Sequence, residues 1–219
     1  TQQVIPHPSC HLTFLKNNST FNGIQQNIYQ HKLSGRGNIV GTKFTPAGFQ
    51  PFAKQAIMRM PEITNQTINI KNIFKIDVKP FEKTILDLKN HQDKIQKIEQ
   101  EIFDNIPSID DHIIRLNHLV KQIETNKNIR KVKDISNLFD LDERQIQRLF
   151  SKYIGINAKW IINRYRIHDA LDALAPAQEF NWSELALELG YFDQAHFIKD
   201  FKQLVGNSPA KYSKLLHNQ

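Results

Sequence analysis

The chain has 219 residues, 40% of them hydrophobic, and carries 29 Lys and Arg against 22 Asp and Glu, which gives a net charge of +7. This length fits one large domain or two small ones, and the apolar content excludes an intrinsically disordered chain. The single cysteine, Cys10, excludes an internal disulfide and a multi-cysteine zinc site, and no apolar run is long enough to span a membrane.

The positive charge suits an acidic partner such as nucleic acid, but it is not concentrated in one region. Residues 126–219 hold 14 Lys and Arg and 11 Asp and Glu, a net of +3, and residues 1–125 carry the other +4. No signal peptide is recognisable, so the cytoplasm is the default location. Because the chain starts at Thr1 without a Met and its first residues already resemble a strand, we expect an N-terminal portion to be missing.

Short apolar runs separated by Gly, Pro and Asn dominate residues 1–81. The expected strands are 11–15, 27–33, 39–44 and 67–70, with a turn at 34–38 and a short helix within 48–58. Several short strands with such turns predict a small β-sandwich or barrel. A phosphate-binding loop at Gly35-Arg36-Gly37 is disfavoured, because a strand rather than a helix follows it.

From about Phe81 the apolar period becomes helical, and residues 90–93 divide the region into two helices. Ile95, Ile98 and Ile102 form a stripe at helical spacing. This stripe is either a dimer seam or a face that packs on the protein's own sheet, and its short length favours packing.

Pro107 and Ser108 predict the start of another helix, with Ser108 as the N-cap. Its expected apolar face is Ile109, Ile113, Leu116 and Val120, and residues 126–128 end it. We therefore expect a β-rich domain with trailing helices over 1–105 and an all-α domain over 106–219.

The all-α domain nearly repeats itself. Residues 135–150 and 185–201 each predict a short helix, a sharp turn and a longer amphipathic helix, which is the helix-turn-helix pattern. The offset between the copies is 50 residues at the turn and 51 at the last Phe, so the second copy has one extra turn residue. The motifs are expected at about 131–154 and 182–205, with a connecting helix at about 157–175 that Pro176 ends and a last helix from Ser208-Pro209.

Equivalent positions of the two motifs carry residues that the geometry needs. A small residue is required where the helices cross, a left-handed conformation in the turn, and an N-cap on the second helix. The pairs are Ser136 with Ala186, Asp140 with Gly190, Asp142 with Asp193, Ile146 with Phe197 and Phe150 with Phe201. Exposed helices often carry Arg, Lys and Gln, so one motif alone would be ambiguous, but two matching copies favour DNA binding.

Side chains left on the outer face of each second helix suit base edges, as Arg suits guanine and Gln suits adenine. The expected base-reading residues are Arg144, Gln145, Gln147, Arg148, Gln194, Ala195, His196 and Lys199. The expected phosphate contacts are Lys152, Arg164, Arg166, Lys202 and Lys211. Two such helices would enter successive major grooves ~34 Å apart on one face of promoter DNA.

The sequence contains little that favours a metal site or a catalytic site. His7, Cys10 and His11 suggest a metal cluster, but Cys10 and His11 point to opposite faces of a strand and no carboxylate is near in sequence. Asp110-Asp111 lies in the first turn of a helix, where acids favour the dipole. No nucleophile and base come together, so we expect no enzyme and no cofactor. The remaining alternative is a ligand-binding or protein-interaction module whose helical domain no longer reads DNA.

The helical half resembles the DNA-binding domain of the AraC/XylS family of bacterial transcription regulators. The resemblance covers about 108–216 and is carried by Leu185-Ala186, by the run from Gly190 to Gly206, by Ser208-Pro209 and by Tyr212. Ser136 and Asp140 depart from the usual Ala and Gly. The resemblance implies that DNA binding affects RNA polymerase, usually as activation.

The N-terminal half is similar to the small cupin-like sensory domain that precedes such DNA-binding domains, on residues 5–14 and 40–49. This similarity implies a role in effector binding or in homodimer formation. Such domains also have a strand before the position of Ile5, and we expect that strand to be absent from this chain. The predicted fold class is α+β, with a small β-rich, cupin-like domain followed by two helix-turn-helix motifs joined by a connecting helix.

Overall fold

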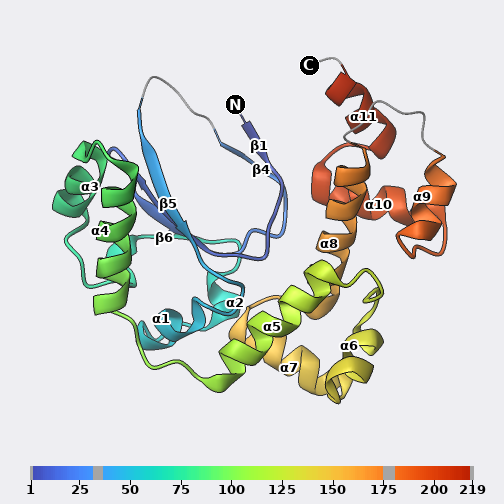
Figure 1. Ribbon diagram of the computed structural model, residues 1–219, viewed down its shortest axis with the longest axis horizontal. Coiled ribbons are helices and arrows are strands. Elements are labelled where there is room, and N and C mark those ends of the chain that lie inside the picture. Colours follow the sequence, from blue (N-terminus) through green and yellow to red (C-terminus); the bar gives the residue numbers. More distant parts are fainter. Residues whose placement is uncertain (1, 32–36, 175–180, 218–219) are drawn as a thin grey trace.

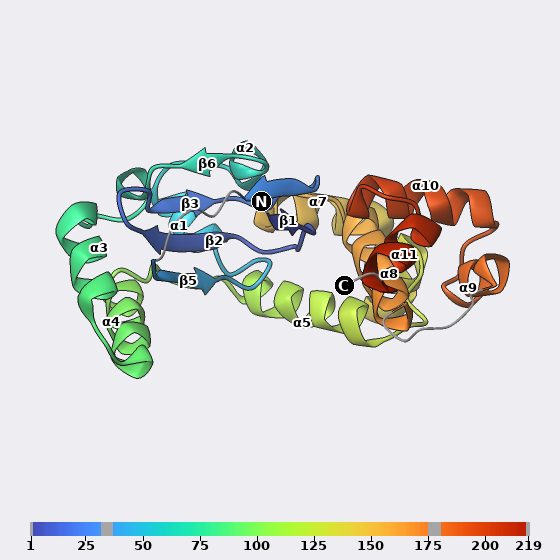
Figure 2. The same ribbon diagram turned by 90° about the horizontal axis from the view of Figure 1, so that it is seen from above.

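The computed structural model describes residues 2–31, 37–174 and 181–217. Strands and short helices form the N-terminal half, and a purely helical domain follows, so the α+β fold class is confirmed. The molecule is elongated, with the sheets and the α3–α4 helices toward one end and α9 to α11 at the other (Figure 2). Within the described ranges, no helix combines the length and apolar character needed to cross a bilayer.

Two antiparallel sheets make up the strand region (Figure 1). The smaller pairs β1 (Gln2–Val4) with β4 (Tyr29–His31). The larger has the order β5 (Ile39–Lys43), β2 (His11–Leu15), β3 (Thr20–Asn22) and β6 (Thr67–Ile68). The expected strands at 11–15 and 39–44 are confirmed, and the one at 67–70 shrinks to two residues. Of the strand expected at 27–33, the structure shows Tyr29–His31, while residues 32 and 33 lie outside the described part of the chain.

One expectation about the strands is wrong, and one strand was not expected. A strand does precede Ile5, because β1 pairs residue by residue with β4. The sequence also missed β3, a strand too short for its alternation to be seen against the polar residues around it. The turn expected at 34–38 lies mostly outside the described residues.

The larger sheet is held by an aromatic core. Alternation along β2 buries Leu12 and Phe14, and Phe21 of β3 stacks on Phe49 at a ring-centroid distance of 4.0 Å. Phe49 precedes α1 (Gln50–Gln55), the short helix expected within 48–58. The small elements α2 (Met60–Ile63) and η1 (Ile70–Asn72) were not expected, and they add Met60, Ile63 and Ile70 to the same core.

Helices α3 (Val78–Asp87) and α4 (His91–Asp104) follow the sheet, and Asn90 caps α4 by accepting a bond from the Gln92 amide. Of the isoleucine stripe, Ile98 is buried and Ile102 packs partly on the core, while Ile95 is 46% exposed. Two of the three residues therefore serve the protein's own packing.

The next helix, α5 (Asp111–Thr125), begins two residues later than expected. Asp110, not Ser108, is the N-cap, since its carboxylate accepts a 2.9 Å bond from the His112 amide. The same carboxylate also accepts a bond from the Tyr153 hydroxyl at 2.7 Å, a tertiary contact that fixes Asp110 in place. Ile109 accordingly lies outside the helix and is 53% exposed.

Both helix-turn-helix motifs are confirmed. The helices are α6 (Val132–Phe139), α7 (Glu143–Tyr153), the connecting α8 (Ala158–Ala173), α9 (Trp182–Glu188), α10 (Gln194–Val205) and α11 (Pro209–His217). Pro176, the expected end of the connecting helix, lies outside the described residues.

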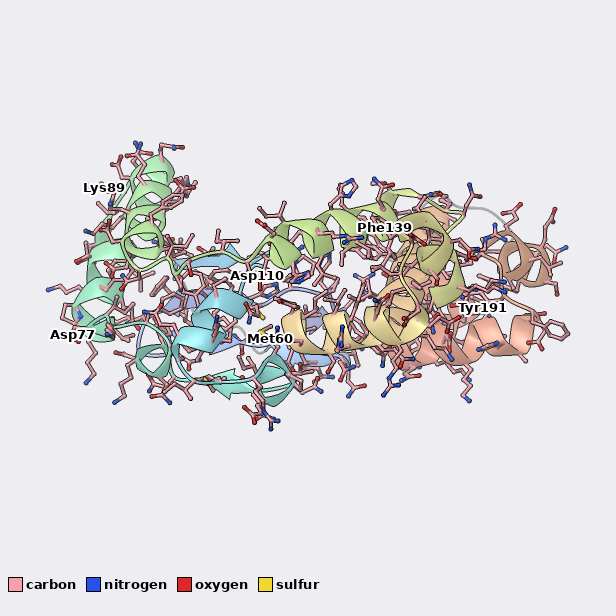
Figure 3. The ribbon with its side chains drawn as sticks, turned by 90° about the horizontal axis from the view of Figure 1, so that it is seen from below. Met60, Asp77, Lys89, Asp110, Phe139 and Tyr191 are labelled. Atoms are coloured by element: carbon pink, nitrogen blue, oxygen red, sulfur yellow. The ribbon has the colours of Figure 1, made fainter. Side chains whose placement is uncertain are left out.

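Apolar packing crosses the boundary that the sequence suggests near residue 105. One buried cluster runs from Cys10 in the strand region through the first motif to Tyr165, and a second one, from Ile167 to Val205, holds the second motif. Figure 3 shows Met60, from the strand half, beside the helices of the first motif. The first motif is therefore packed on the N-terminal half, while the second has its own core.

Candidate nucleic-acid interface

The turns of the two motifs have the backbone shape that their sequences predict. Asp140 has φ 50° and ψ 49°, and Gly190 has φ 77°, so both lie in the left-handed region. Ala186 is fully buried at the crossing point, as expected. Ser136, in the equivalent place, donates its hydroxyl hydrogen to the carbonyl of Leu141 and so closes the first turn with a bond that Ala cannot make.

Both second helices begin with the expected aspartate caps. The carboxylate of Asp142 accepts a 2.7 Å bond from the Gln145 amide, and that of Asp193 accepts a 2.7 Å bond from the His196 amide. The Gln145 side-chain oxygen in turn accepts from the Asp142 amide at 2.9 Å, which completes a capping box. One polar group of Gln145 is therefore used by the helix itself, a role that the Asp-x-x-Gln spacing could have indicated.

The inner faces of α7 and α10 are anchored at equivalent positions. Ile146, Phe150, Phe197 and Phe201 each have 0% exposed surface. With one face of each helix held against the core, the opposite face is presented outward.

On α7 the outward face carries Arg144, Gln147 and Arg148, which are all exposed. These three make no side-chain hydrogen bond or ion pair within the described ranges, and with Asp142 and Gln145 they line one surface hollow. Two guanidinium groups and a carboxamide are therefore free for a ligand that brings acceptors and donors from outside.

On α10 the expected base-reading residues differ in exposure and in whether their side chains contact other residues. Ala195, His196 and Lys199 are exposed. Gln194 is half-buried, and its side-chain oxygen accepts a 2.8 Å bond from the Ser183 hydroxyl of α9. The His196 Nε2 atom lies 3.9 Å from an Asp200 carboxylate oxygen. Gln194 thus helps hold α9 against α10, which sequence spacing alone did not reveal.

The phosphate contact predicted for Arg164 is not supported by its placement, because only 3% of this residue is exposed. Its Nε donates to the carbonyl of Pro6 in the N-terminal half, and burial lowers the pKa of the guanidinium. Residue 164 faces the N-terminal half, and this contact between the two halves could not be predicted from the sequence.

Arg166 is also used inside the protein. Its guanidinium lies 3.7 Å from the centre of the Tyr191 ring, and its Nε donates to the carbonyl of Leu189 at 2.9 Å. Arg130 donates to the neighbouring carbonyl of Glu188, also at 2.9 Å. Two arginines therefore satisfy the C-terminal carbonyls of α9, where positive charge is favoured by the helix dipole. The phosphate role predicted for Arg166 is not supported by this placement. The contact of Arg130 was not predicted, because no local pattern relates residue 130 to residue 188.

Lys152, Lys202 and Lys211 are exposed, as a phosphate contact requires. The Lys152 ammonium lies 4.7 Å from the centre of the Tyr153 ring, at the end of α7. In Figures 2 and 3, α7 and α10 follow one another along the same long edge of the molecule. Lys152 therefore lies on α7 and Lys202 on α10, beside the exposed polar residues of those helices, while Lys211 lies on α11.

Among the described residues, no three metal-binding side chains come together. Cys10 is fully buried, and burial raises the pKa of its thiol to about 12. His7 and His11 are joined through the hydroxyl of Ser9, at 3.2 and 3.0 Å.

Comparison with known families identifies two regions. Residues 135–215 match a family described as a helix-turn-helix domain, and residues 1–69 match a domain of unknown function, DUF6597. An uncharacterized HTH-type transcriptional regulator of Haemophilus influenzae is 29% identical over 96 residues, which are 44% of this chain and 32% of that protein. The transcriptional regulatory protein HptR of Staphylococcus aureus is 29% identical over 106 residues, 48% of this chain and 40% of that protein. The chain thus matches two fifths or less of the length of these relatives.

Solved structures with similarity include a probable AraC family transcriptional regulator from Rhodopseudomonas palustris. It has 21% identity and a TM-score of 0.40, over 45% of this chain and 93% of that one. Apo ToxT K231A from Vibrio cholerae has 18% identity and a TM-score of 0.39, over 98% of this chain and 88% of that one.

Proposed function

Because the chain belongs to the AraC family and residues 135–215 are its helix-turn-helix DNA-binding domain, we propose that it regulates transcription by reading a specific promoter sequence. In this proposal α7 and α10 enter two adjacent major grooves on one face of the duplex. Binding then affects RNA polymerase, and the N-terminal half senses a small-molecule effector or forms a homodimer.

One observation carries the proposal. Two motifs of the same geometry bury equivalent apolar residues and leave equivalent outer faces exposed, and on α7 that face carries Arg144, Gln147 and Arg148 without partners. If the polar faces of α7 and α10 served only solubility, the repetition of the N-caps, the left-handed turns and the buried apolar positions would be unexplained. Arg and Gln are the side chains that make paired contacts with guanine and adenine.

The corrected set of residues sharpens the proposal. Base reading is assigned to Arg144, Gln147, Arg148, Ala195, His196 and Lys199, with smaller contributions from Gln145 and Gln194, whose side-chain oxygens are engaged. Phosphate contacts are assigned to Lys152, Lys202 and Lys211. Arg164 and Arg166 are removed from the phosphate set because of their internal contacts.

Selection of random double-stranded DNA on the purified protein tests the proposal. We expect an enriched site with two recognised blocks about one helical turn apart, and an affinity that falls as salt rises, with a slope that counts the phosphates contacted. A site with one block would limit recognition to one motif. Equal, weak affinity for all sequences would favour the alternative, a ligand-binding or interaction module that no longer reads DNA.

A further inference from the structure

The turn of the second motif is one residue longer than the turn of the first, and the backbone hydrogen bonds show which residue is additional. The amide of Leu141 donates to the carbonyl of Ser136 at 3.4 Å, and the amide of Tyr191 makes the equivalent bond to the carbonyl of Ala186 at 2.8 Å. Leu141 and Tyr191 are therefore counterparts. The N-cap of α7 follows Leu141 directly, whereas Phe192 stands between Tyr191 and the N-cap of α10. Phe192 is thus the additional residue.

Phe192 contributes little to the packing of the turn that contains it. It is 90% exposed, whereas its neighbour Tyr191 is 4% exposed and packs against the ring of Phe197, with the ring centroids 5.4 Å apart. Among the described phenylalanines, only Phe103 also has an exposed side chain, at 63%. Because apolar surface is more stable when it is removed from water, the ring of Phe192 would gain from contact with a partner.

Phe192 lies at the end of α10 that a recognition helix presents to DNA. It directly precedes Asp193, whose carboxylate accepts the 2.7 Å bond from the His196 amide. In Figure 3, the neighbouring Tyr191 is labelled between α9 and α10, away from the strand-bearing half. Residues at the N-terminus of a recognition helix contact base edges in the major groove. The ring of Phe192 is therefore placed where α10 would meet the bases.

The exposed side chains that follow Phe192 on α10 identify the kind of partner. Ala195, His196, Lys199 and Lys202 are exposed, so the outer face of this helix is mainly polar and carries two ammonium groups. One apolar ring beside several cationic and polar side chains suits a polyanion with a small apolar group between its charges. An apolar protein surface would leave the lysines without partners.

The ring of Phe192 also limits which base it can recognise. A phenyl ring carries no hydrogen-bond donor or acceptor, so it cannot bond to the polar atoms of a base edge. The C5-methyl of thymine is the alkyl group that base pairs present in the major groove, and Phe is among the side chains that contact it. A thymine methyl is therefore the group that fits this ring.

We propose that Phe192 reads a thymine by packing its ring against the C5-methyl group in the major groove that α10 enters. The contact belongs to the second motif alone, since the first turn has no residue at this place. The inference rests on the proposed function and adds to it the identity of one base in the block that α10 recognises.

Deoxyuridine tests the methyl group by itself, because it differs from thymidine only in lacking that group. Each thymine of the selected DNA site is replaced singly by deoxyuridine, and competition binding with the whole chain measures the affinity for each duplex. We expect one replacement to weaken binding of the parent protein by about fourfold, the effect of leaving one methyl group unburied. That thymine should lie in only one of the two recognised blocks.

Three variants locate the contact. Phe192→Ala removes the ring, and we expect it to bind the thymine and deoxyuridine duplexes with nearly the same affinity. Phe192→Leu keeps an apolar side chain and should retain part of the difference. Phe103→Ala is the matched control, because Phe103 is an exposed phenylalanine on α4, and it should retain the full difference. Circular dichroism and thermal unfolding check that the variants fold like the parent.

Three outcomes would overturn the contact: no replacement by deoxyuridine weakens binding, Phe192→Ala keeps the difference, or Phe103→Ala loses it as well. A difference that persists in Phe192→Ala would assign the methyl group to another residue, such as Ala195. Failure of the proposed function is recognised separately. If selection enriches no site, the proposed function is removed and the Phe192 contact with it, whereas an enriched site with an unchanged response in Phe192→Ala removes the contact alone.

Discussion

The hydroxyl of Thr64 donates to the carbonyl of Gly155 at 3.2 Å, and thereby ties the N-terminal half to a residue just beyond the end of α7. The same hydroxyl also lies 3.2 Å from the carbonyl of Met60, the first residue of α2, four positions earlier in the chain. Movement of α2 relative to α7 must break this contact. The position of α7 is therefore coupled to the strand-bearing half, whereas α10 belongs to a separate apolar cluster.

This junction predicts that Gly155→Ala is strongly destabilising. Gly155 has φ +90°, and an added Cβ would lie 2.6 Å from the Met60 carbonyl oxygen. We expect the free energy of unfolding to fall by about 2 kcal/mol or more, since both the left-handed backbone and the clash oppose the methyl group. Urea unfolding measures this. Gly37→Ala, which meets nothing within 4 Å, should change stability by less than about 0.5 kcal/mol.

Exchanging the turn residues of the two helix-turn-helix motifs should have opposite effects on the free energy of unfolding. Asp140 occupies a left-handed position where glycine is unstrained, so Asp140→Gly should raise the free energy of unfolding by about 0.5 kcal/mol. Gly190→Asp should lower it by about 1–2 kcal/mol or more, because its Cβ would also meet the Arg130 side chain at 2.3 Å. Equal effects of the two exchanges would contradict the assignment of these turns.

Arg148 is exposed and unpartnered on the outer face of α7, so Arg148→Ala should weaken binding to the selected DNA site by ~1–3 kcal/mol and relax preference at one position. Competition binding against sites with single base changes measures both effects. Lys89→Ala, far from α7 and α10, serves as the control. Unchanged affinity together with unchanged preference would remove Arg148 from the reading set.

Lys152 and Arg164 should differ in their effect on the salt dependence of DNA binding. Loss of one phosphate contact in Lys152→Ala is expected to weaken binding to all sequences and reduce the salt slope by about 1. Arg164→Met should leave that slope unchanged, since the guanidinium is buried against Pro6. A reduced slope for Arg164→Met, in a variant that folds normally, would restore its phosphate role.

His7 should make the protein sensitive to acid. Burial, with Lys43 and Arg164, lowers its folded-state pKa from 6.5 to about 3, so the unfolded chain takes up this proton at a higher pH than the folded protein. The corresponding stability is present above pH 6.5 and is lost progressively as the pH falls from about 6.5 toward 3. Urea unfolding at pH 7, 6 and 5 should show a smaller decline for His7→Asn than for the parent.

Much of the helical domain could be predicted from the sequence because its signals are local. An N-cap such as Asp142 bonds to an amide three residues away, and a left-handed turn at Gly190 depends on the residue at that position. The apolar spacing of Ile146 and Phe150 follows from the helical period. Repetition of these signals in a second copy made the two motifs and their exposed faces recognisable together.

The roles that depend on distant partners could be decided only by the tertiary structure. An arginine at 164 or 166 has the same sequence surroundings whether it meets phosphate or the protein's own carbonyls, and the packing of Pro6 and of α9 decides between them. Asp110 replaced Ser108 as the cap because Tyr153, 43 residues away, holds its carboxylate. The sequence by itself thus determined the helices and their outward faces, which arise from contacts within a few residues. The seam between the halves, and every charge buried there, arises from contacts across the chain that no local pattern records.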